Sequence, residues 1–411
     1  MKIALKKINN DVNLKIVKTS KFKFVNIQVS FMFNLDYEDI AAYNLLHNIL
    51  TTRNNKYQTM KDFNLYLENN YGMSIRGNYF NRGNVGIFNV ISNSMNSKYS
   101  LDDDLLIKQI ETIKDCLLSP YLTNEVLDEV KMIYIEKLKE KLNKKTYILK
   151  KKINDKFGLS NPYGVNIEGD IDSISSVTLE KLKEVYNKLL NSDCTIYVCG
   201  DVEENKIEEL FSNLNLKNSN QKILDLSYLK EIEKVDVQVY ESNFLQSAIS
   251  LIYECDINYN DELYYALKVF IEMFNYDLFN IIREKYNYCY YIYAISNNYL
   301  NTIEIVSEIE SKNLDNVIKY IDEIIKGYET NFNEEQFEIC KNKILTYIKT
   351  SLDSSRDVLE LEFSFDFNRN VNSIEELENR YKSVNSNQIK EVSKMISLKM
   401  VSILKEASNN G

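Results

Sequence analysis

The chain repeats one order of elements along its length, and this repeat constrains the fold more than any other feature. In the first half, an alternating strand pattern at residues 26–33 is followed by an amphipathic helix at 39–50 and by a long helix after residue 123. In the second half, the same three patterns stand at 247–253, at 261–274 and after residue 333. Tyr286 lies 215 positions after Tyr71, and Asn333 lies 210 positions after Thr123. A repeat of this length indicates duplicated domains rather than a solenoid.

The length of 411 residues also favours two domains, because a single core stops growing at smaller sizes. We predict a first domain at residues 1–211, a polar linker at 212–226 and a second domain at 227–411. Runs of strands mix with paired helices without regular βαβ alternation. The pattern therefore predicts an α+β fold, in which each domain packs an antiparallel-rich sheet against helices.

The net charge and the lack of long apolar runs argue against nucleic acids and membranes as partners. The net charge of −10 argues against a protein that binds the phosphate backbone of nucleic acids. No run approaches the roughly 20 apolar residues of a membrane span, and residues 1–20 contain no continuous apolar core of a signal peptide. Six scattered cysteines form no C-x-x-C and are expected to be reduced thiols. The chain is expected to be cytoplasmic, with neither nucleic acid nor membrane as a partner.

Histidine occurs once, at His47. A His-rich metal site or a zinc helix with two histidines therefore cannot be built from this chain alone. Only ten glycines are present, which nearly excludes Gly-rich phosphate loops.

A set of short motifs stands in one order along nearly the whole chain. They are Asn-Pro-Tyr-Gly at 161–164, Gly-Asp at 169–170, Cys-Gly-Asp-Val at 199–202, the strand at 246–253 and Leu-Phe-Asn-Ile-Ile-Arg-Glu-Lys at 278–285. This order resembles the pitrilysin/insulinase family, the inverzincin peptidases that include mitochondrial processing peptidase. The resemblance implies a LuxS/mitochondrial processing peptidase-like metallohydrolase fold, with two homologous domains in a clam-shell arrangement. The family's glycine-rich turn is shortened here, since residues 272–277 contain no glycine.

The family's zinc helix carries H-x-x-E-H, with two histidine ligands and a glutamate that activates the metal-bound water. In this chain Tyr43 stands at the first histidine, Leu46 at the glutamate and His47 at the second histidine. Glu136, seven residues after Glu129, matches the family's third ligand. Leu46 cannot accept a proton, and two remaining ligands would hold zinc weakly. We therefore expect no metal here, with His47 packed on an apolar stripe and Glu136 solvated on a charged helix.

The second domain keeps a different family feature. Family peptidases carry an arginine followed seven residues later by a tyrosine, and this pair binds the substrate backbone; Arg283 and Tyr290 match it. Guanidinium and phenol groups are donors that can hold a peptide carbonyl and an oxyanion. The alternative is structural, with the arginine paired to a nearby glutamate and the tyrosine packed on a strand.

In two-subunit members of the family, one subunit brings the zinc helix and the other brings the arginine–tyrosine pair. The resemblance thus implies a non-catalytic subunit of a heterodimeric zinc metallopeptidase that processes peptides, with zinc held by a homologous partner containing H-x-x-E-H. Leader-peptide processing of a modified peptide is one such use. The alternative is a catalytically silent peptide-binding or scaffolding protein, as a homodimer. An active peptidase is disfavoured, because both a ligand and the base are missing.

Overall fold

The computed structural model describes residues 2–8, 12–158, 162–212, 214, 216, 235–242, 244 and 247–406. It divides into two compact units, each built from three stretches of chain: Met1–Leu138, Asn166–Asp225 and Ser351–Asp366 in the first, and Lys139–Val165, Leu226–Thr350 and Phe367–Gly411 in the second. The predicted boundaries at residues 211 and 227 follow the sequence repeat and stay a prediction. Apart from residues 212, 214 and 216, the predicted linker lies outside the described residues, as do Asn161 and Gln246.

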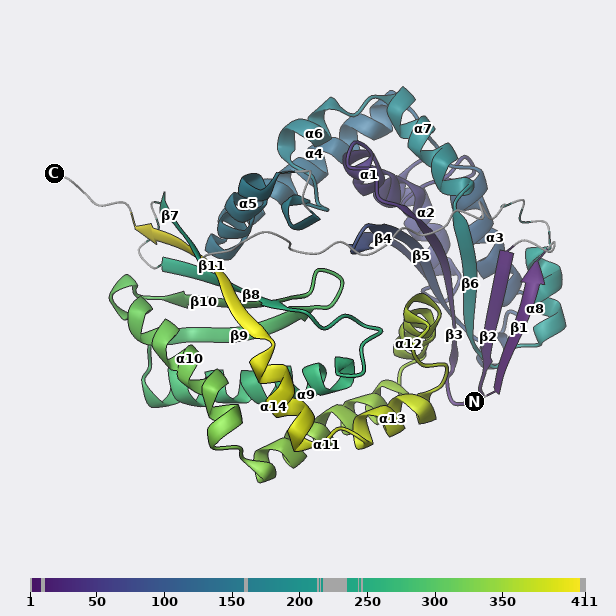
Figure 1. The fold of residues 1–411 in the computed structure, drawn as a ribbon. Helices are drawn as coiled ribbons and strands as arrows, with labels where there is room; N and C mark the ends of the chain where they lie inside the picture. The colour runs from purple at the N-terminus through teal and green to yellow at the C-terminus, as the bar shows by residue number, and fades with distance from the viewer. Residues whose placement is uncertain are drawn as a thin grey trace. The chain divides into compact units, whose positions relative to one another are not determined.

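The first unit contains a six-stranded sheet in the order β1-β2-β6-β3-β5-β4 (Figure 1). All neighbouring strands are antiparallel except β2 and β6, which run parallel. Its strands are β1 (Lys2–Ile8), β2 (Val12–Lys18), β3 (Phe24–Asn34), β4 (Ser74–Arg82), β5 (Val85–Met95) and β6 (Asp193–Gly200). Its helices are α1 (Ile40–Leu50), α2 (Met60–Asn69), η1 (Ser97–Tyr99), α3 (Leu105–Leu118), α4 (Asn124–Lys141), α6 (Ile171–Ser176), α7 (Leu179–Leu190), α8 (Glu204–Phe211) and α12 (Ser355–Asn368).

The second unit contains a five-stranded sheet in the order β7-β11-β8-β10-β9. Here too one pair, β7 and β11, is parallel and the others are antiparallel. Its strands are β7 (Asp236–Ser242), β8 (Ser247–Cys255), β9 (Cys289–Asn297), β10 (Thr302–Ile309) and β11 (Ile396–Glu406). Its helices are α5 (Lys145–Phe157), η2 (Pro162–Gly164), α9 (Tyr264–Asp277), η3 (Leu278–Lys285), η4 (Ser311–Asn313), α10 (Leu314–Thr330), α11 (Glu334–Ser351), α13 (Ile374–Lys382) and α14 (Ser386–Lys394).

The two sheets share one topology, since β2-β6-β3-β5-β4 and β7-β11-β8-β10-β9 have the same order and the same single parallel pair. The repeat extends to the backbone. Gly72 has a φ of 66°, and Asn287, 215 positions later, has a φ of 52°. Both residues follow the end of a helical segment and have left-handed backbone dihedral angles, a conformation that glycine and asparagine tolerate best. The predicted α+β fold of duplicated design is confirmed.

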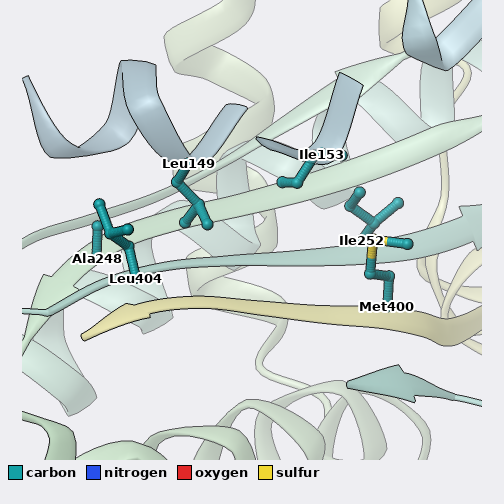
Figure 2. Close-up of a cluster of buried hydrophobic side chains, with 6 residues drawn as sticks. All are labelled: Leu149, Ile153, Ala248, Ile252, Met400 and Leu404. Atoms are coloured by element: carbon teal, nitrogen blue, oxygen red, sulfur yellow. The ribbon is translucent and has the colours of Figure 1, made fainter. Parts of the chain in front are cut away.

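Helices α5 and α12 begin 210 positions apart and so occupy equivalent places in the repeat. Each of them packs on the sheet that the other half of the sequence forms. Helix α5 comes from the first half and buries apolar side chains against the second sheet, which Figure 2 shows as a cluster of Leu149, Ile153, Ala248, Ile252, Met400 and Leu404. Helix α12 comes from the second half and packs on the first sheet. The chain therefore exchanges one helix between its two repeats.

Both exchanged helices bury apolar side chains, and α12 adds a buried ion pair. Apolar burial holds α5. Helix α12 also buries apolar side chains, among them Leu359 and Phe363. In addition, Lys15 Nζ on β2 lies 2.7 Å from Glu362 Oε2 and 2.8 Å from Asp366 Oδ1. The Glu362 side chain is only 2% exposed, so its charge depends on this lysine. Arg82 adds a cation–π contact to Phe363, 5.0 Å from the ring centroid.

All six cysteines are unpaired and buried, which agrees with the expected reduced thiols. Burial raises the pKa of the Cys116 thiol to about 12, so this thiol stays protonated and unreactive at neutral pH. None of the helices in the described residues combines the length and the apolarity that a membrane crossing requires.

We expect Leu149→Ala to destabilise the second unit, because it removes a buried side chain from the contact between α5 and its sheet. The loss should be about 2–5 kcal/mol, measured by equilibrium urea unfolding. Lys150→Ala is the matched control, since this neighbouring side chain is exposed. Equal unfolding midpoints for the two variants would contradict the assigned role of α5.

We expect Lys15→Met to cost about 3–5 kcal/mol, because it leaves the buried Glu362 carboxylate without its lysine. The double variant Lys15→Met/Glu362→Leu should be more stable than this single variant, since it removes both buried charges. The comparison uses the same urea unfolding. A double variant less stable than Lys15→Met would show that the pair does not govern the docking of α12.

Candidate functional site

The positions that match the family's zinc motif lie on α1. Asp39, which is 1% exposed, anchors the start of this helix. Its carboxylate oxygens lie 2.6 Å from Lys181 Nζ and 2.8 Å from Lys188 Nζ, and both lysines are on α7. A carboxylate at this end of a helix also interacts favourably with the helix dipole. The helix is therefore held firmly in the first unit, whatever its chemical role.

Tyr43, at the position of the first histidine ligand, is part of the core. Its ring is 2% exposed and stacks on Phe33 at 4.4 Å between centroids, with Tyr79 at 5.2 Å. Burial raises the pKa of the Tyr43 hydroxyl well above its usual value, so the phenol remains protonated. A protonated phenol within an aromatic stack does not fit a zinc ligand.

Leu46, at the position of the catalytic base, is completely buried and offers no lone pair. His47 is half-buried, and its ring meets Phe88 edge-on at 6.5 Å. Burial, and then the charge of Lys137, lower the pKa of His47 to about 4, so the imidazole is neutral at pH 7. Gly77 on β4 allows this close packing, because a Cβ there would lie 2.9 Å from the His47 carbonyl oxygen.

Glu136 lies on an exposed position of α4, away from the buried stripe that includes Val130 and Tyr134. Glu129 is already engaged, since its two oxygens accept hydrogen bonds of 2.8 and 2.9 Å from the buried Arg53 guanidinium. Among the described residues, no three His, Cys, Asp or Glu side chains gather into a group that could hold a metal ion. The side chains on α1 do not fit zinc.

Arg283 and Tyr290 lie together in the second unit. Arg283 is on η3, a π-helical segment that continues α9, and Tyr290 is on the edge strand β9. The Arg283 Cζ atom lies 5.8 Å from the centroid of the Tyr290 ring and 4.8 Å from that of Phe279. Tyr290 is 80% exposed, and the Arg283 Nε atom is 3.7 Å from a Glu284 carboxylate oxygen. Both donors are therefore accessible to a ligand.

Two local irregularities produce this arrangement. Asn287 turns the chain between η3 and β9 with its left-handed φ of 52°, and its N–H donates to the Arg283 carbonyl at 2.9 Å. On β9 the register shifts opposite Glu308, so that Tyr290 and Tyr291 share one position of the partner strand. Such a bulge re-aims side chains. Here Tyr290 projects into solvent, whereas the Tyr291 hydroxyl lies 3.1 Å from Glu308 Oε1.

An aromatic group beside this pair was missed by the sequence analysis. Tyr286 stacks on Tyr288 at 5.4 Å and on Tyr320 at 4.2 Å between centroids. The hydrogen bond with Tyr320, followed by Lys285, lowers the pKa of the Tyr286 hydroxyl. The tyrosine-rich run at 286–293 was the available signal, but Tyr320 comes from α10 and only the fold brings it there.

The Arg283–Tyr290 pair can hold a peptide, whereas the zinc-motif positions supply no group that would cleave one. Arg283 and Tyr290 supply positively charged and neutral donors suited to carbonyl oxygens. The first unit supplies no base at Leu46, and its only histidine is neutral and packed. The chain therefore has binding chemistry in the second unit and no matching catalytic chemistry at the zinc-motif positions.

Comparisons with known proteins agree with this picture. The family model described as "Peptidase M16 inactive domain" matches residues 176–344, a range that includes Arg283 and Tyr290. A "Probable inactive metalloprotease YmfF" from Bacillus subtilis (strain 168) is 24% identical over 370 residues, covering 84% of this chain and 85% of the relative.

Solved structures show the same fold at low sequence identity. A conserved protein from Enterococcus faecalis V583 superposes with a TM-score of 0.88 at 23% identity, over 97% of each chain. A peptidase M16 inactive domain from Pseudomonas fluorescens superposes with a TM-score of 0.80 at 12% identity, over 99% of each chain. The predicted resemblance to the pitrilysin/insulinase peptidases is confirmed: residues 176–344 match the peptidase M16 inactive domain, the chain is similar to a probable inactive metalloprotease, and its fold is that of M16-like peptidases.

Proposed function

We propose that this chain is the non-catalytic subunit of a heterodimeric zinc metallopeptidase. In this proposal Arg283 and Tyr290 complete the active site of a homologous subunit that carries H-x-x-E-H and zinc. The observation that supports it most is the proximity of these two side chains, at 5.8 Å, in a chain whose own ligand and base positions hold Tyr43 and Leu46. A chain that only filled space would not need two exposed donors in this arrangement.

The two side chains suit complementary tasks. The Arg283 guanidinium stays charged at all physiological pH values and can hold a substrate carbonyl through two parallel N–H groups. The Tyr290 hydroxyl can donate to an oxygen that gains negative charge during the reaction. Zinc in the partner subunit would polarise the scissile carbonyl. This chain would thus contribute substrate positioning and transition-state stabilisation without supplying the base.

The substrate proposed is an unstructured peptide, and leader-peptide removal from a modified peptide is one use that suits it. The proposed compartment is the cytoplasm, because all six cysteines are unpaired thiols.

A catalytically silent peptide-binding or scaffolding homodimer is the second candidate. It is favoured by the edge strand β9, where Tyr290, Tyr293 and Ile295 are 80%, 40% and 53% exposed. An edge strand with exposed apolar side chains can bind an extended peptide without any catalytic group. The two candidates differ in whether the Tyr290 hydroxyl affects a reaction rate.

We expect the purified chain to contain no stoichiometric zinc and to leave unstructured peptides intact, because Tyr43 and Leu46 replace a ligand and the base. Elemental analysis after dialysis measures the metal, and mass spectrometry of an incubated peptide measures cleavage. One zinc per chain together with zinc-dependent cleavage would end the proposal of a non-catalytic subunit.

We expect Tyr290→Phe and Arg283→Ala to leave assembly with a zinc-bearing homologue intact and to lower turnover on the order of 10²–10³-fold. Tyr290→Phe is the cleaner test, because it deletes only the hydroxyl. Arg283→Lys should not restore the full rate, since an ammonium lacks the planar fork. The effect should appear in kcat rather than only in KM.

Tyr276→Phe is the matched control for this experiment, because Tyr276 is another exposed tyrosine, 52% exposed on the preceding helix α9. Its turnover should equal that of the unmodified complex. If Tyr290→Phe and Arg283→Ala also leave turnover unchanged, the chain acts as a scaffold and the second candidate is correct.

A further inference from the structure

The Arg283 guanidinium has few polar contacts with the rest of the protein. Within the described part of the chain it donates no hydrogen bond, and its ion pair there is a 3.7 Å contact from Nε to a Glu284 carboxylate oxygen. The two side chains are 37% and 56% exposed, so this contact contributes little. Polar contacts within the chain therefore do not determine how the guanidinium is oriented.

An aromatic ring lies beside the guanidinium instead. The Arg283 Cζ atom is over the Phe279 ring at 4.8 Å from its centroid, compared with 5.8 Å for the ring of Tyr290. Both distances are within the range of a cation–π contact, and the contact with Phe279 is the shorter. A guanidinium that stacks on an aromatic face keeps its N–H groups free, because they point outward in its own plane. The Phe279 ring thus restricts the guanidinium without occupying a donor.

The backbone of η3 brings the ring and the guanidinium together. Leu278 and Ile282, four residues apart, are the buried side chains of this segment. Phe279 and Arg283 each follow one of them by one position, so they share the neighbouring, more exposed side. Residues four apart on a helical segment face each other. The contact between Phe279 and Arg283 is therefore built into η3.

The order of the Arg283 side chain matters for binding. A long side chain that becomes fixed on a ligand loses rotational freedom, and this loss weakens binding. A group that is already restricted in the free protein loses less. Small errors in the position of a group that holds the substrate also slow a reaction, because the reacting atoms are then less well aligned.

We propose that Phe279 is a positioning residue for Arg283. Its ring holds the guanidinium in the orientation in which the N–H groups face a substrate carbonyl, and Phe279 itself needs no contact with the substrate. The kinetic consequence rests on the proposed partnership with a zinc-bearing subunit. The ordering of the guanidinium is a property of this chain alone, so the two can be tested separately.

The first test measures the ordering in the full-length chain by NMR. The heteronuclear NOE of the Arg283 Nε–Hε group, assigned by its absence in Arg283→Lys, reports motion on the picosecond to nanosecond timescale. Phe279→Leu should lower this NOE, because leucine offers no ring face, and Phe279→Tyr should preserve it. Phe24→Leu is the matched control, since Phe24 is 41% exposed in the first unit, close to the 40% of Phe279, and it should leave the NOE unchanged.

Glu284→Gln tests the rival explanation that the ion pair orients the guanidinium. It should leave the NOE of Arg283 close to that of the unmodified chain, because the contact is long and exposed. A larger loss in Glu284→Gln than in Phe279→Leu would overturn the inference.

The second test measures turnover in the complex with a zinc-bearing homologue. Phe279→Leu should lower kcat about three- to tenfold, as expected for the loss of a cation–π contact, and Phe279→Tyr should retain the rate. In an Arg283→Ala background, Phe279→Leu should cause no further loss, because its effect passes through the guanidinium. Circular dichroism confirms that each variant is folded.

The two tests separate this inference from the proposed function. If Arg283→Ala leaves turnover unchanged, the proposed function fails, and the NOE of Arg283 still decides the role of Phe279. The inference is overturned if folded Phe279→Leu leaves that NOE unchanged, or if Phe279→Leu slows turnover as much in the Arg283→Ala background as it does alone.

Discussion

The packing of α5 and α12 on their sheets is the contact on which the architecture depends. Each helix leaves its own sequence repeat and covers the sheet formed by the other repeat, so neither compact unit can be completed by a continuous half of the chain. Leu149 and Ile153 make this contact apolar in the second unit. In the first unit Phe363 is buried in the same way, and Lys15 and Glu362 add a buried ion pair. Apolar burial thus stabilises the exchange in both units, and in the first unit it is joined by an ion pair in which each buried charge requires its partner.

The zinc-motif helix shows how a metal site can be replaced by a core. Tyr43 packs against both Phe33 and Tyr79, and Leu46 is completely buried, so α1 is held by packing that requires no ligand. His47 keeps the residue type of a ligand but is neutral and lies against Phe88. Aromatic stacking and apolar burial stabilise the positions that a metal would otherwise organise.

The Arg283–Tyr290 pair depends on irregular backbone rather than on regular elements. The π-helical η3, the left-handed Asn287 and the bulge opposite Glu308 together set where the two side chains meet. These features concentrate at a point where the sheet ends at an edge strand and side chains are open to solvent. Irregular segments of this kind are common at functional sites, because they aim side chains in directions that regular helices and strands do not allow.

The sequence by itself determined the α+β class, the duplicated order of elements, the degenerate motif at Tyr43 and Leu46, and the seven-residue spacing of Arg283 and Tyr290. Periodicity and chain order carry these features, because they depend on residues near one another in sequence. The tertiary structure alone decided the exchange of α5 and α12 and the joining of Tyr320 to Tyr286. These contacts join residues that are distant along the chain. No local pattern encodes them, since they arise only when packed elements bring such residues together.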